Sequence, residues 1–421
     1  MKKPFQLFKS GLAGAIIIVS LLSGVQSSSA YNESRATPAV VKPPKPKGTP
    51  ILIGGSLGLT GQLATAAAQY KSTYEFWVKE TNANGGLLGR PVELRIYDDQ
   101  SSPNVVRGRY EQLISVDKVD LLMGPYATFL TLPIIPLVNE SKKVLFMAGA
   151  VSVKANRTSD WLVSTYTYQD DTFALGFFKM LDELPKKDRP KKLGVIYLQN
   201  PYTIAMTEGV DGKGGFLNMA KSRGYEVVLQ EQYASNVADF SPLIRKSEEA
   251  GVDALFVANL LNDGIAIAKK VNERGYNPKI LCLCGSQVTV LPAWKDMGAS
   301  GERVFGTTMS WASDKYNNYD KLAKHFKTLG IAPLPTYAQA AYTALQVLGQ
   351  AVTAKNTLDQ RILNKYIKSG AEFDTVVGKV KFDKNGIPGW NSIMLQVQKG
   401  KNEVVWPKNR STSVPLFPLV K

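Results

Sequence analysis

The chain has 421 residues, 44% of them hydrophobic and 20% charged, which excludes a disordered chain and favours two hydrophobic cores over one. Its formal net charge of +16 is spread along the sequence without a nucleic-acid-binding motif, so we expect no nucleic acid as a partner. An acidic small ligand is compatible with this basic excess.

Residues 1–30 have the order of a secretory signal peptide. Three lysines precede an apolar run over 11–25, and Ser28 and Ala30 supply the small residues of a cleavage site. The run is about fifteen residues long, whereas a spanning helix needs roughly 20, which leaves a retained anchor as the alternative. We expect cleavage after Ala30 and a periplasmic protein that begins with a flexible, Pro/Lys-rich tail over 31–50.

From residue 51 onward, short apolar strands alternate with helices. A first block predicts strands at 51–53, 92–97, 121–123 and 144–147 and helices at 62–84, 104–116 and 129–141. A second block predicts helices at 173–184, 203–224, 240–250 and 264–275 and strands at 193–197, 227–232, 254–258 and 280–284. Such alternation is typical of parallel sheets covered on both faces, and two blocks indicate two lobes.

Two of these strands differ from the rest in charge. Strands 92–97 and 227–232 contain charged residues, so we expect them near a sheet edge. After Trp311 the pattern changes, with predicted helices at 319–329, 337–354 and 359–369 and strands at 376–383 and 393–399.

The two cysteines, Cys282 and Cys284, stand two residues apart in a predicted strand. That spacing separates their Cα atoms by about 6.5–7 Å, at or beyond the usual limit for a disulfide. We therefore expect two buried free thiols. A metal site is not expected, because no further cysteine and only one histidine, His325, accompany them.

The segment 54–58 matches the G-x-S-x-G pattern of a nucleophilic serine. The one histidine lies in a basic helix with no acid beside it in sequence, so we expect a Gly-rich loop at a ligand crevice and no hydrolase. Phosphate-loop and dinucleotide motifs do not occur. The sequence thus predicts a protein that is not an enzyme and has no cofactor and no metal.

Small and polar residues follow several predicted strands, at the edge where open α/β sheets bind ligands. Thr128 and Ser152 can each begin a helix and offer a hydroxyl beside backbone N–H groups, which suits a carboxylate, although simple N-capping is the alternative. The candidate ligand-binding residues at these strand ends are Tyr126, Ala127, Thr128, Ala150, Val151, Ser152, Tyr202 and Asn259.

Several short motifs occur in an order and spacing that match those of a known protein family. They are Leu59-Thr60-Gly61, the segment 82–94 (NANGGLLGRPVEL), Tyr97-Asp98-Asp99, Ser102-Pro103 and the segment 337–342 (YAQAAY). In order and spacing the sequence resembles the periplasmic leucine/isoleucine/valine-binding proteins, type I solute-binding proteins of ABC importers. The resemblance extends from about residue 51 to residue 399.

The resemblance implies an α/β fold of two doubly wound parallel-sheet lobes joined by three crossover segments, the type I periplasmic-binding-protein fold. Lobe one would be 50–165 plus 310–378, and lobe two 166–309 plus 379–411. It also implies a monomer that captures a small carboxylate or amino-acid-like ligand between its lobes and delivers it to the membrane permease of an ABC importer. The alternative is a ligand-sensing module for a membrane receptor.

The family's binding site can be carried over residue by residue. The Thr128 hydroxyl and the Val151 backbone N–H would hold the ligand carboxylate, and Tyr202 would close over the ligand. The acid that binds the α-ammonium group should lie near 283–286, where this chain has Cys284 and Ser286 and no acid. A buried ammonium without a counter-charge is costly. Either another acid substitutes for it or the ligand lacks an α-ammonium group. We expect a small carboxylate of the second kind, and branched-chain amino acids are the alternative ligands.

Overall fold

The computed structural model of this chain describes residues 43–166, 169–284, 289, 292–309, 316–389 and 393–419. The predicted signal peptide at 1–30 and the predicted tail up to residue 42 lie outside the described residues. The rest of that tail is held in place: the Lys47 N–H donates to the Gly89 carbonyl oxygen at 2.8 Å, and the Arg90 Nε donates to the Thr49 carbonyl oxygen at 2.8 Å. Within the described ranges, no helix has both the length and the apolar character needed to cross a bilayer.

The first sheet has five parallel strands in the order β2-β1-β3-β4-β5. Its strands are β1 (Ile51–Leu57), β2 (Val92–Asp98), β3 (Leu121–Met123), β4 (Leu145–Met147) and β5 (Leu162–Ser164). The connecting helices are α1 (Ala64–Ala83), α2 (Pro103–Glu111), α3 (Thr128–Thr131), α4 (Ile135–Ser141) and α5 (Val153–Thr158). Strands β3, β4 and β5 are buried along their whole length, which explains their continuous apolar sequences.

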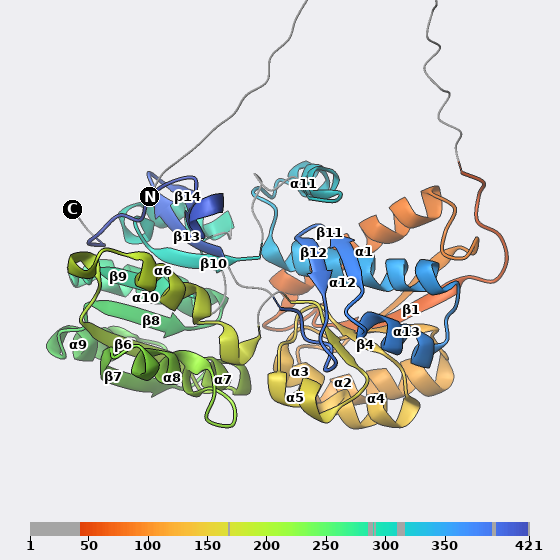
Figure 1. Cartoon of the computed structure of the whole chain (residues 1–421), viewed down its shortest axis with the longest axis horizontal. Coiled ribbons are helices and arrows are strands. Elements are labelled where there is room, and N and C mark those ends of the chain that lie inside the picture. The colour runs from red at the N-terminus through yellow and green to blue at the C-terminus, as the bar shows by residue number, and fades with distance from the viewer. Residues whose placement is uncertain are drawn as a thin grey trace, which may run out of the picture. The chain divides into compact units, whose positions relative to one another are not determined.

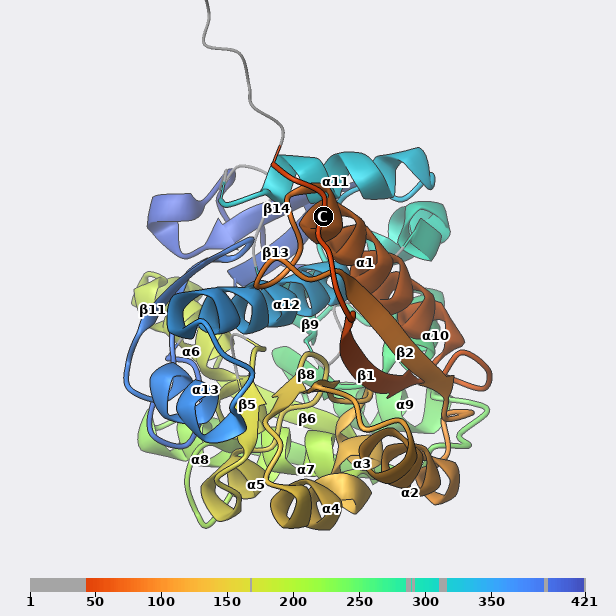
Figure 2. The same cartoon turned by 90° about the vertical axis from the view of Figure 1, so that its right-hand side faces the viewer.

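The chain returns to this first sheet after residue 316. Helix α12 (Thr336–Lys355) packs against α1 and contacts β4, and Figure 2 shows it lying beside α1. The other returning elements are α11 (Tyr319–Thr328), α13 (Gln360–Ile367) and the antiparallel pair β11 (Glu372–Thr375) and β12 (Gly378–Lys381). The change in the strand–helix pattern after Trp311 therefore marks the return of the chain to the first sheet.

The second sheet has seven strands in the order β14-β13-β10-β9-β8-β6-β7, seen side by side in Figure 1. Its parallel strands are β6 (Lys192–Leu198), β7 (Glu226–Tyr233), β8 (Ala254–Ala258), β9 (Ile280–Leu283) and β10 (Phe305–Thr308). Strand β13 (Ile393–Gln398) pairs antiparallel with both β10 and β14 (Lys401–Trp406), so the sheet is mixed rather than purely parallel. A tight turn at Lys399 and Gly400, both with positive φ, joins β13 and β14, and such a hairpin can only be antiparallel.

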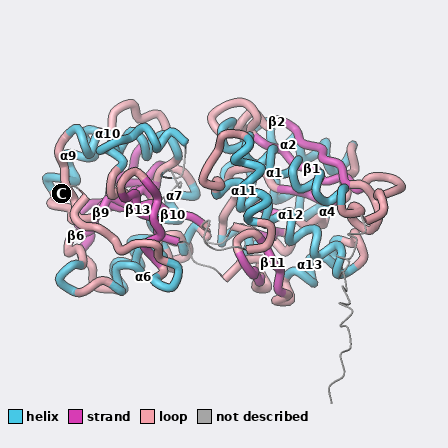
Figure 3. Tube along the Cα trace, turned by 90° about the horizontal axis from the view of Figure 1, so that it is seen from above, coloured by secondary structure: helices cyan, strands magenta, loops and turns pink. Residues whose placement is uncertain are grey.

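Helices lie on both faces of the second sheet. Figure 3 shows α6 (Leu175–Glu183) and α10 (Leu261–Glu273) on opposite sides of it. The remaining helical elements of this half are α7 (Pro201–Glu208), α8 (Gly215–Ser222), α9 (Ser241–Glu249) and a 3₁₀ segment, Pro292–Gly301. The sheet is therefore doubly wound, as the alternation of strands and helices predicted.

The parallel strands of both sheets follow one order, in which the second strand lies outside the first and the third lies on its other side. The order reverses between β1 and β3 in one sheet and between β6 and β8 in the other. Ligands of open α/β sheets bind at the carboxyl ends of strands at such a reversal. The chain passes between the sheets after β5, after β10 and after β12, which confirms the predicted fold class with its three crossovers. The lobe boundaries 50–165 plus 310–378 and 166–309 plus 379–411 stay a prediction.

The two charged strands confirm the edge prediction, because β2 and β7 are the outer strands of their sheets. Three other predictions were wrong in detail. The helix predicted at 129–141 is divided into α3, a 3₁₀ turn and α4, since Pro133 and Pro136 cannot donate to the preceding turn. The helix predicted at 203–224 is two helices, α7 and α8, separated by glycines with positive φ. The strand predicted at 376–383 is the shorter β12, and its hairpin partner β11 was not predicted.

Candidate functional site

A pocket lies among loops that follow strands of both sheets, with a cavity volume of about 50 Å³. A single water needs roughly 10–15 Å³, so the pocket has room for a small ligand group. Most of its lining residues follow the strands on either side of the two order reversals, as expected for a ligand site in this fold. The lining residues are Leu63, Tyr126, Ala127, Thr128, Phe129, Gly149, Val151, Tyr166, Asn200, Pro201, Tyr202, Leu260 and Tyr337.

Five of the ten predicted site residues line this pocket: Tyr126, Ala127, Thr128, Val151 and Tyr202. Tyr126 and Ala127 come from the loop after β3, and Thr128 is the first residue of α3. Val151 follows β4, and Tyr202 is the second residue of α7, which follows β6. The structure thus brings together side chains that the sequence places in separate loops. Lining a pocket does not identify a ligand, so the ligand-binding role of these five residues stays a prediction.

Two lining tyrosines, Tyr126 and Tyr337, form one wall of the pocket, and the buried Tyr70 packs against both of them. The rings of Tyr70 and Tyr126 stack with centroids 5.3 Å apart, and Tyr337 meets Tyr126 edge-on at 5.2 Å. The Tyr126 hydroxyl donates to the Tyr337 hydroxyl at 3.3 Å, and the Tyr70 hydroxyl donates to the Ala148 carbonyl oxygen at 3.1 Å. Burial raises the pKa of Tyr126, so its hydroxyl stays protonated at neutral pH. The wall therefore combines apolar ring faces with hydroxyl groups that are already hydrogen-bonded.

Gly149 makes this wall possible. A Cβ atom at this position would lie 2.5 Å from Cδ2 of Tyr126 and 2.9 Å from Cζ of Tyr70, closer than carbon atoms can pack. Only glycine allows both rings to lie against the chain after β4.

Thr128 and Val151 are bonded to each other. The Thr128 hydroxyl donates to the Val151 carbonyl oxygen at 3.1 Å and accepts from the Val151 N–H at 3.2 Å. We predicted that the Thr128 hydroxyl and the Val151 N–H hold a ligand carboxylate. For this, the carboxylate must replace the hydrogen bonds that the two residues make with each other. Thr128 is the first residue of α3 and does not cap it, since the N-cap position is Ala127.

The other predicted site residues lie outside the pocket lining. Ser152 caps α5, because its Oγ accepts from the Ala155 N–H at 3.2 Å. This is the N-capping alternative rather than a ligand contact. Ala150 is buried, and the Asn259 Nδ2 donates to the Leu260 carbonyl oxygen at 2.8 Å. Ser286 lies outside the described residues.

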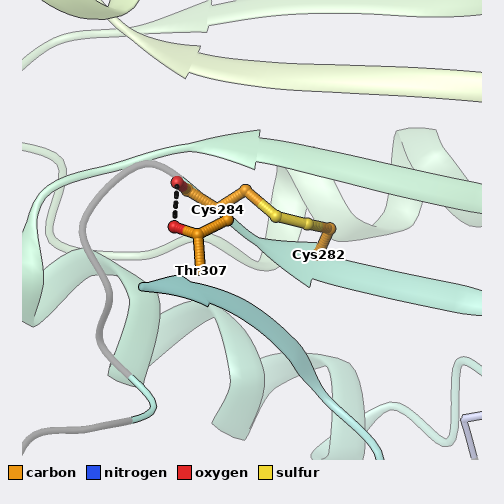
Figure 4. Close-up of a disulfide and its surroundings, with 3 residues drawn as sticks. All are labelled: Cys282, Cys284 and Thr307. Atoms are coloured by element: carbon orange, nitrogen blue, oxygen red, sulfur yellow. Dashed lines mark hydrogen bonds between the residues drawn. A yellow bond between two sulfur atoms is a disulfide. The ribbon is translucent and has the colours of Figure 1, made fainter. Parts of the chain in front are cut away.

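Cys284 forms a disulfide with Cys282, shown in Figure 4, so the prediction of two free thiols was wrong. Strand β9 ends at Leu283, and the two Cα atoms are 5.2 Å apart rather than the expected 6.5–7 Å. That distance falls within the range of disulfides. The prediction failed because Cys284 lies just past the strand, where the backbone is no longer extended. The Thr307 hydroxyl donates to the Cys284 carbonyl oxygen at 3.3 Å.

No charged side chain is among the residues that line this pocket in the described part of the chain. An acid that sequence reasoning missed, Asp170, lies nearby in the crossover after β5 and is 3% exposed. Its Oδ1 accepts from the backbone N–H of Val153 and of Asp171, each at 3.0 Å. Burial and the neighbouring Asp171 raise the pKa of Asp170 to about 7, against the hydrogen bonds that lower it.

Other lining residues are not among the ten predicted site residues. Asn200 and Pro201 adjoin Tyr202, and Asn200 caps α7 by accepting from the Thr203 N–H at 2.9 Å. Tyr337 belongs to a motif that the sequence revealed, but its place beside Tyr126 depends on the return of the chain to the first sheet. No sequence signal pointed to Leu63, Phe129 or Leu260.

The G-x-S-x-G segment is not a crevice loop, which corrects the prediction for 54–58. Residues up to Leu57 belong to β1, and the buried Ser56 hydroxyl donates to Asp99 Oδ2 at 2.7 Å. His325 Nε2 lies 2.9 Å from Ser72 Oγ instead, so Ser56 has no histidine as a base. In the described ranges, no group of three or more His, Cys, Asp or Glu side chains could hold a metal ion.

Comparisons with known proteins agree with this fold. The family model for periplasmic binding proteins matches residues 50–402. A Leu/Ile/Val-binding protein homolog 1 from Brucella suis biovar 1 is 26% identical over 361 residues, covering 83% of this chain and 91% of that protein. The isoleucine complex of the branched-chain amino acid transporter substrate-binding protein LivJ from Streptococcus pneumoniae has a TM-score of 0.69 at 18% identity, over 85% of this chain and 98% of LivJ.

A solute-binding protein of an ABC transporter from Rhodopseudomonas palustris, in complex with 3,4-dihydroxybenzoic acid, also has a TM-score of 0.69 at 18% identity, over 88% of this chain and 98% of that one. Two doubly wound sheets with a pocket at their order reversals are an architecture that binds small ligands. The chain belongs to the periplasmic binding protein family. Its family and its structural neighbours are solute-binding proteins and not enzymes, and membership implies a location outside the cytoplasm.

Proposed function

We propose that this protein captures a small carboxylate with an apolar or aromatic body between its two lobes and delivers it to the membrane permease of an ABC importer. The observation that carries this proposal is the composition of the pocket. Tyrosine rings, Phe129, Leu63 and Leu260 offer apolar surface, and Thr128, Val151 and Asn200 offer polar groups. Ligand pockets that combine apolar walls with a few convergent polar groups bind small organic molecules.

The Thr128–Val151 pair supports a carboxylate at this end of the pocket. A carboxylate placed there would accept from the Thr128 hydroxyl and the Val151 N–H in place of the bonds that the two residues make with each other. Since no cation lines the pocket in the described ranges, hydrogen bonds to such donors would have to compensate for the lost hydration of the anion.

The lack of an acid among the lining residues disfavours a free α-ammonium group. The relatives bound to isoleucine and to 3,4-dihydroxybenzoic acid both have carboxylate ligands, and only the second ligand lacks an α-ammonium. The second type of ligand fits the tyrosine wall, because aromatic rings pack favourably edge-on or offset. Branched-chain amino acids are the main alternative.

Binding would work by closure. One group of contacts comes from loops of the first sheet and Tyr202 from the second, so a ligand held by both stabilises the closed arrangement. We propose lobes at 50–165 plus 310–378 and 166–309 plus 379–411, a monomeric state, and a periplasmic location after cleavage at Ala30.

Calorimetry on matched ligand pairs tests this proposal. Leucine and its deaminated analogue 4-methylpentanoate differ only in the ammonium group, and benzoate and benzamide differ in the carboxylate. We expect the carboxylate without an α-ammonium to bind in each case, and Tyr202→Ala to weaken it while Tyr202→Phe retains most of the affinity. Sub-micromolar binding of leucine with none of 4-methylpentanoate would contradict the proposed ligand class. Delivery is tested separately: loss of the gene should abolish uptake of that ligand.

A further inference from the structure

A second pocket adjoins the proposed ligand pocket and has a cavity volume of about 460 Å³. Leu63, Tyr126 and Leu260 line both pockets, so these three side chains form the boundary between two neighbouring spaces. Beyond that boundary the lining becomes more polar and includes Ser235 and Asn262. A ligand longer than the first pocket would extend past the three apolar side chains into this second space.

Asp263 is the one charged side chain that lines either pocket in the described part of the chain. It is half-buried in the first turn of α10, and its Oδ2 accepts from the Tyr233 hydroxyl at 2.8 Å. Burial raises the pKa of Asp263, against the hydrogen bonds that lower it. Within the described ranges no lysine, arginine or histidine forms an ion pair with it. A half-buried carboxylate of this kind gains from a cationic or strongly hydrogen-bond-donating partner.

The placement of the two polar ends restricts the ligand. Thr128 lines only the first pocket and Asp263 only the second, with Leu63, Tyr126 and Leu260 between them. An α-amino acid has a single carbon between its carboxylate and its ammonium, so it cannot place one group at each end. A ligand with several methylene groups between a carboxylate and an amine can, and its methylene groups would lie against the three apolar side chains.

We propose that the ligand is an ω-amino carboxylate, whose carboxylate binds at Thr128 and whose distant amine binds at Asp263. This inference rests on the proposed carboxylate site and extends it. It also accounts for the lack of an acid at 283–286: the amine of such a ligand lies several carbons from the carboxylate and needs a counter-charge elsewhere.

Calorimetry with hexanoate and 6-aminohexanoate tests the inference. The wild-type protein should bind 6-aminohexanoate at least about tenfold more tightly than hexanoate, the gain expected for a charge-assisted contact. In Asp263→Asn that preference should disappear while hexanoate binding stays the same. Asp239→Asn is the matched control, because it removes the same charge from an exposed position outside both pockets and should leave the preference intact.

A second variant, Tyr233→Phe, tests the inference in case Asp263→Asn does not fold. Tyr233→Phe removes the hydroxyl that donates to Asp263 but keeps the carboxylate, so the preference for 6-aminohexanoate should persist or grow. Equal or weaker binding of 6-aminohexanoate by the wild type, or a preference that survives Asp263→Asn, would overturn the inference and leave the carboxylate site standing. If neither compound binds, and no carboxylate of the calorimetric series binds either, the proposed function itself fails.

Discussion

The Thr128 hydroxyl and the Val151 peptide group are hydrogen-bonded to each other in both directions, at 3.1 and 3.2 Å. One side chain thereby fixes the loop after β4 against the start of α3, at the place where the two strand ends meet. Each of these groups could instead bond to a carboxylate. The pair is therefore both a structural link and the proposed anion site.

Removing the Thr128 hydroxyl should weaken carboxylate binding. We expect Thr128→Ala to cost about 1.5–3 kcal/mol, the range for a hydrogen bond to a charged group, or roughly a tenfold to hundredfold rise in Kd. Thr128→Ser should retain most of the affinity, because it keeps the hydroxyl. Thr131→Ala is the control: Thr131 is buried in the same helix and does not line the pocket, and its hydroxyl donates to the Ala127 carbonyl oxygen. Equal losses in the Thr128 and Thr131 variants, measured by calorimetry, would indicate a general packing effect.

Gly149→Ala should disturb the tyrosine wall. The added methyl group would collide with the rings of Tyr126 and Tyr70, so we expect a loss of about 1–3 kcal/mol in the free energy of unfolding together with weaker ligand binding. Gly108→Ala is the matched control, since Gly108 lies exposed in α2 and its Cβ would meet nothing within 4 Å. That substitution should be neutral or stabilising by about 0.5–1 kcal/mol. Urea unfolding of the two variants measures the difference, and equal stabilities would contradict this account of the wall.

The cysteine pair predicts the outcome of a thiol count. Since Cys282 and Cys284 are linked, thiol labelling of the unfolded, unreduced protein should find no free thiol, and labelling after reduction should find two. Two free thiols before reduction would contradict the disulfide and support an extended strand through residue 284.

Asp170 should make stability depend on pH. Its folded-state pKa of about 7 lies above the value near 4 of an unfolded chain, so between these values the folded protein holds a proton that the unfolded chain has released. The free energy of unfolding should therefore fall by about 2–4 kcal/mol as pH rises from 4 to 7, and level off above. Asp170→Asn should lack this fall, because an amide oxygen can still accept from the Val153 and Asp171 N–H groups.

Asp239→Asn is the control for that measurement, since Asp239 is exposed and its hydrogen bonds to Ser241 lower its pKa rather than raise it. Urea unfolding at pH 5 and pH 8 compares the three proteins. An identical pH dependence in the wild type and in Asp170→Asn would show that Asp170 is ionised throughout.

Much of the fold could be read from the sequence because it depends on local patterns. Uncharged apolar runs gave the strands β3, β4 and β8, and charges on β2 and β7 identified them as edge strands. The strand–helix alternation fixed the α/β class, since a parallel strand requires a crossover. The loop after β3 could be singled out for the same reason, as the carboxyl ends of parallel strands collect at one edge.

Only the tertiary structure decided what these loops meet. Tyr337 and Tyr126 are 211 residues apart in sequence, and nothing local predicts that their hydroxyls lie 3.3 Å apart. Whether Ser152 would cap a helix or face the pocket depended on backbone direction after β4, which residue type does not specify. The Cys282–Cys284 link depended on β9 ending one residue early, and strand ends are set by the neighbours that a strand pairs with rather than by its own sequence.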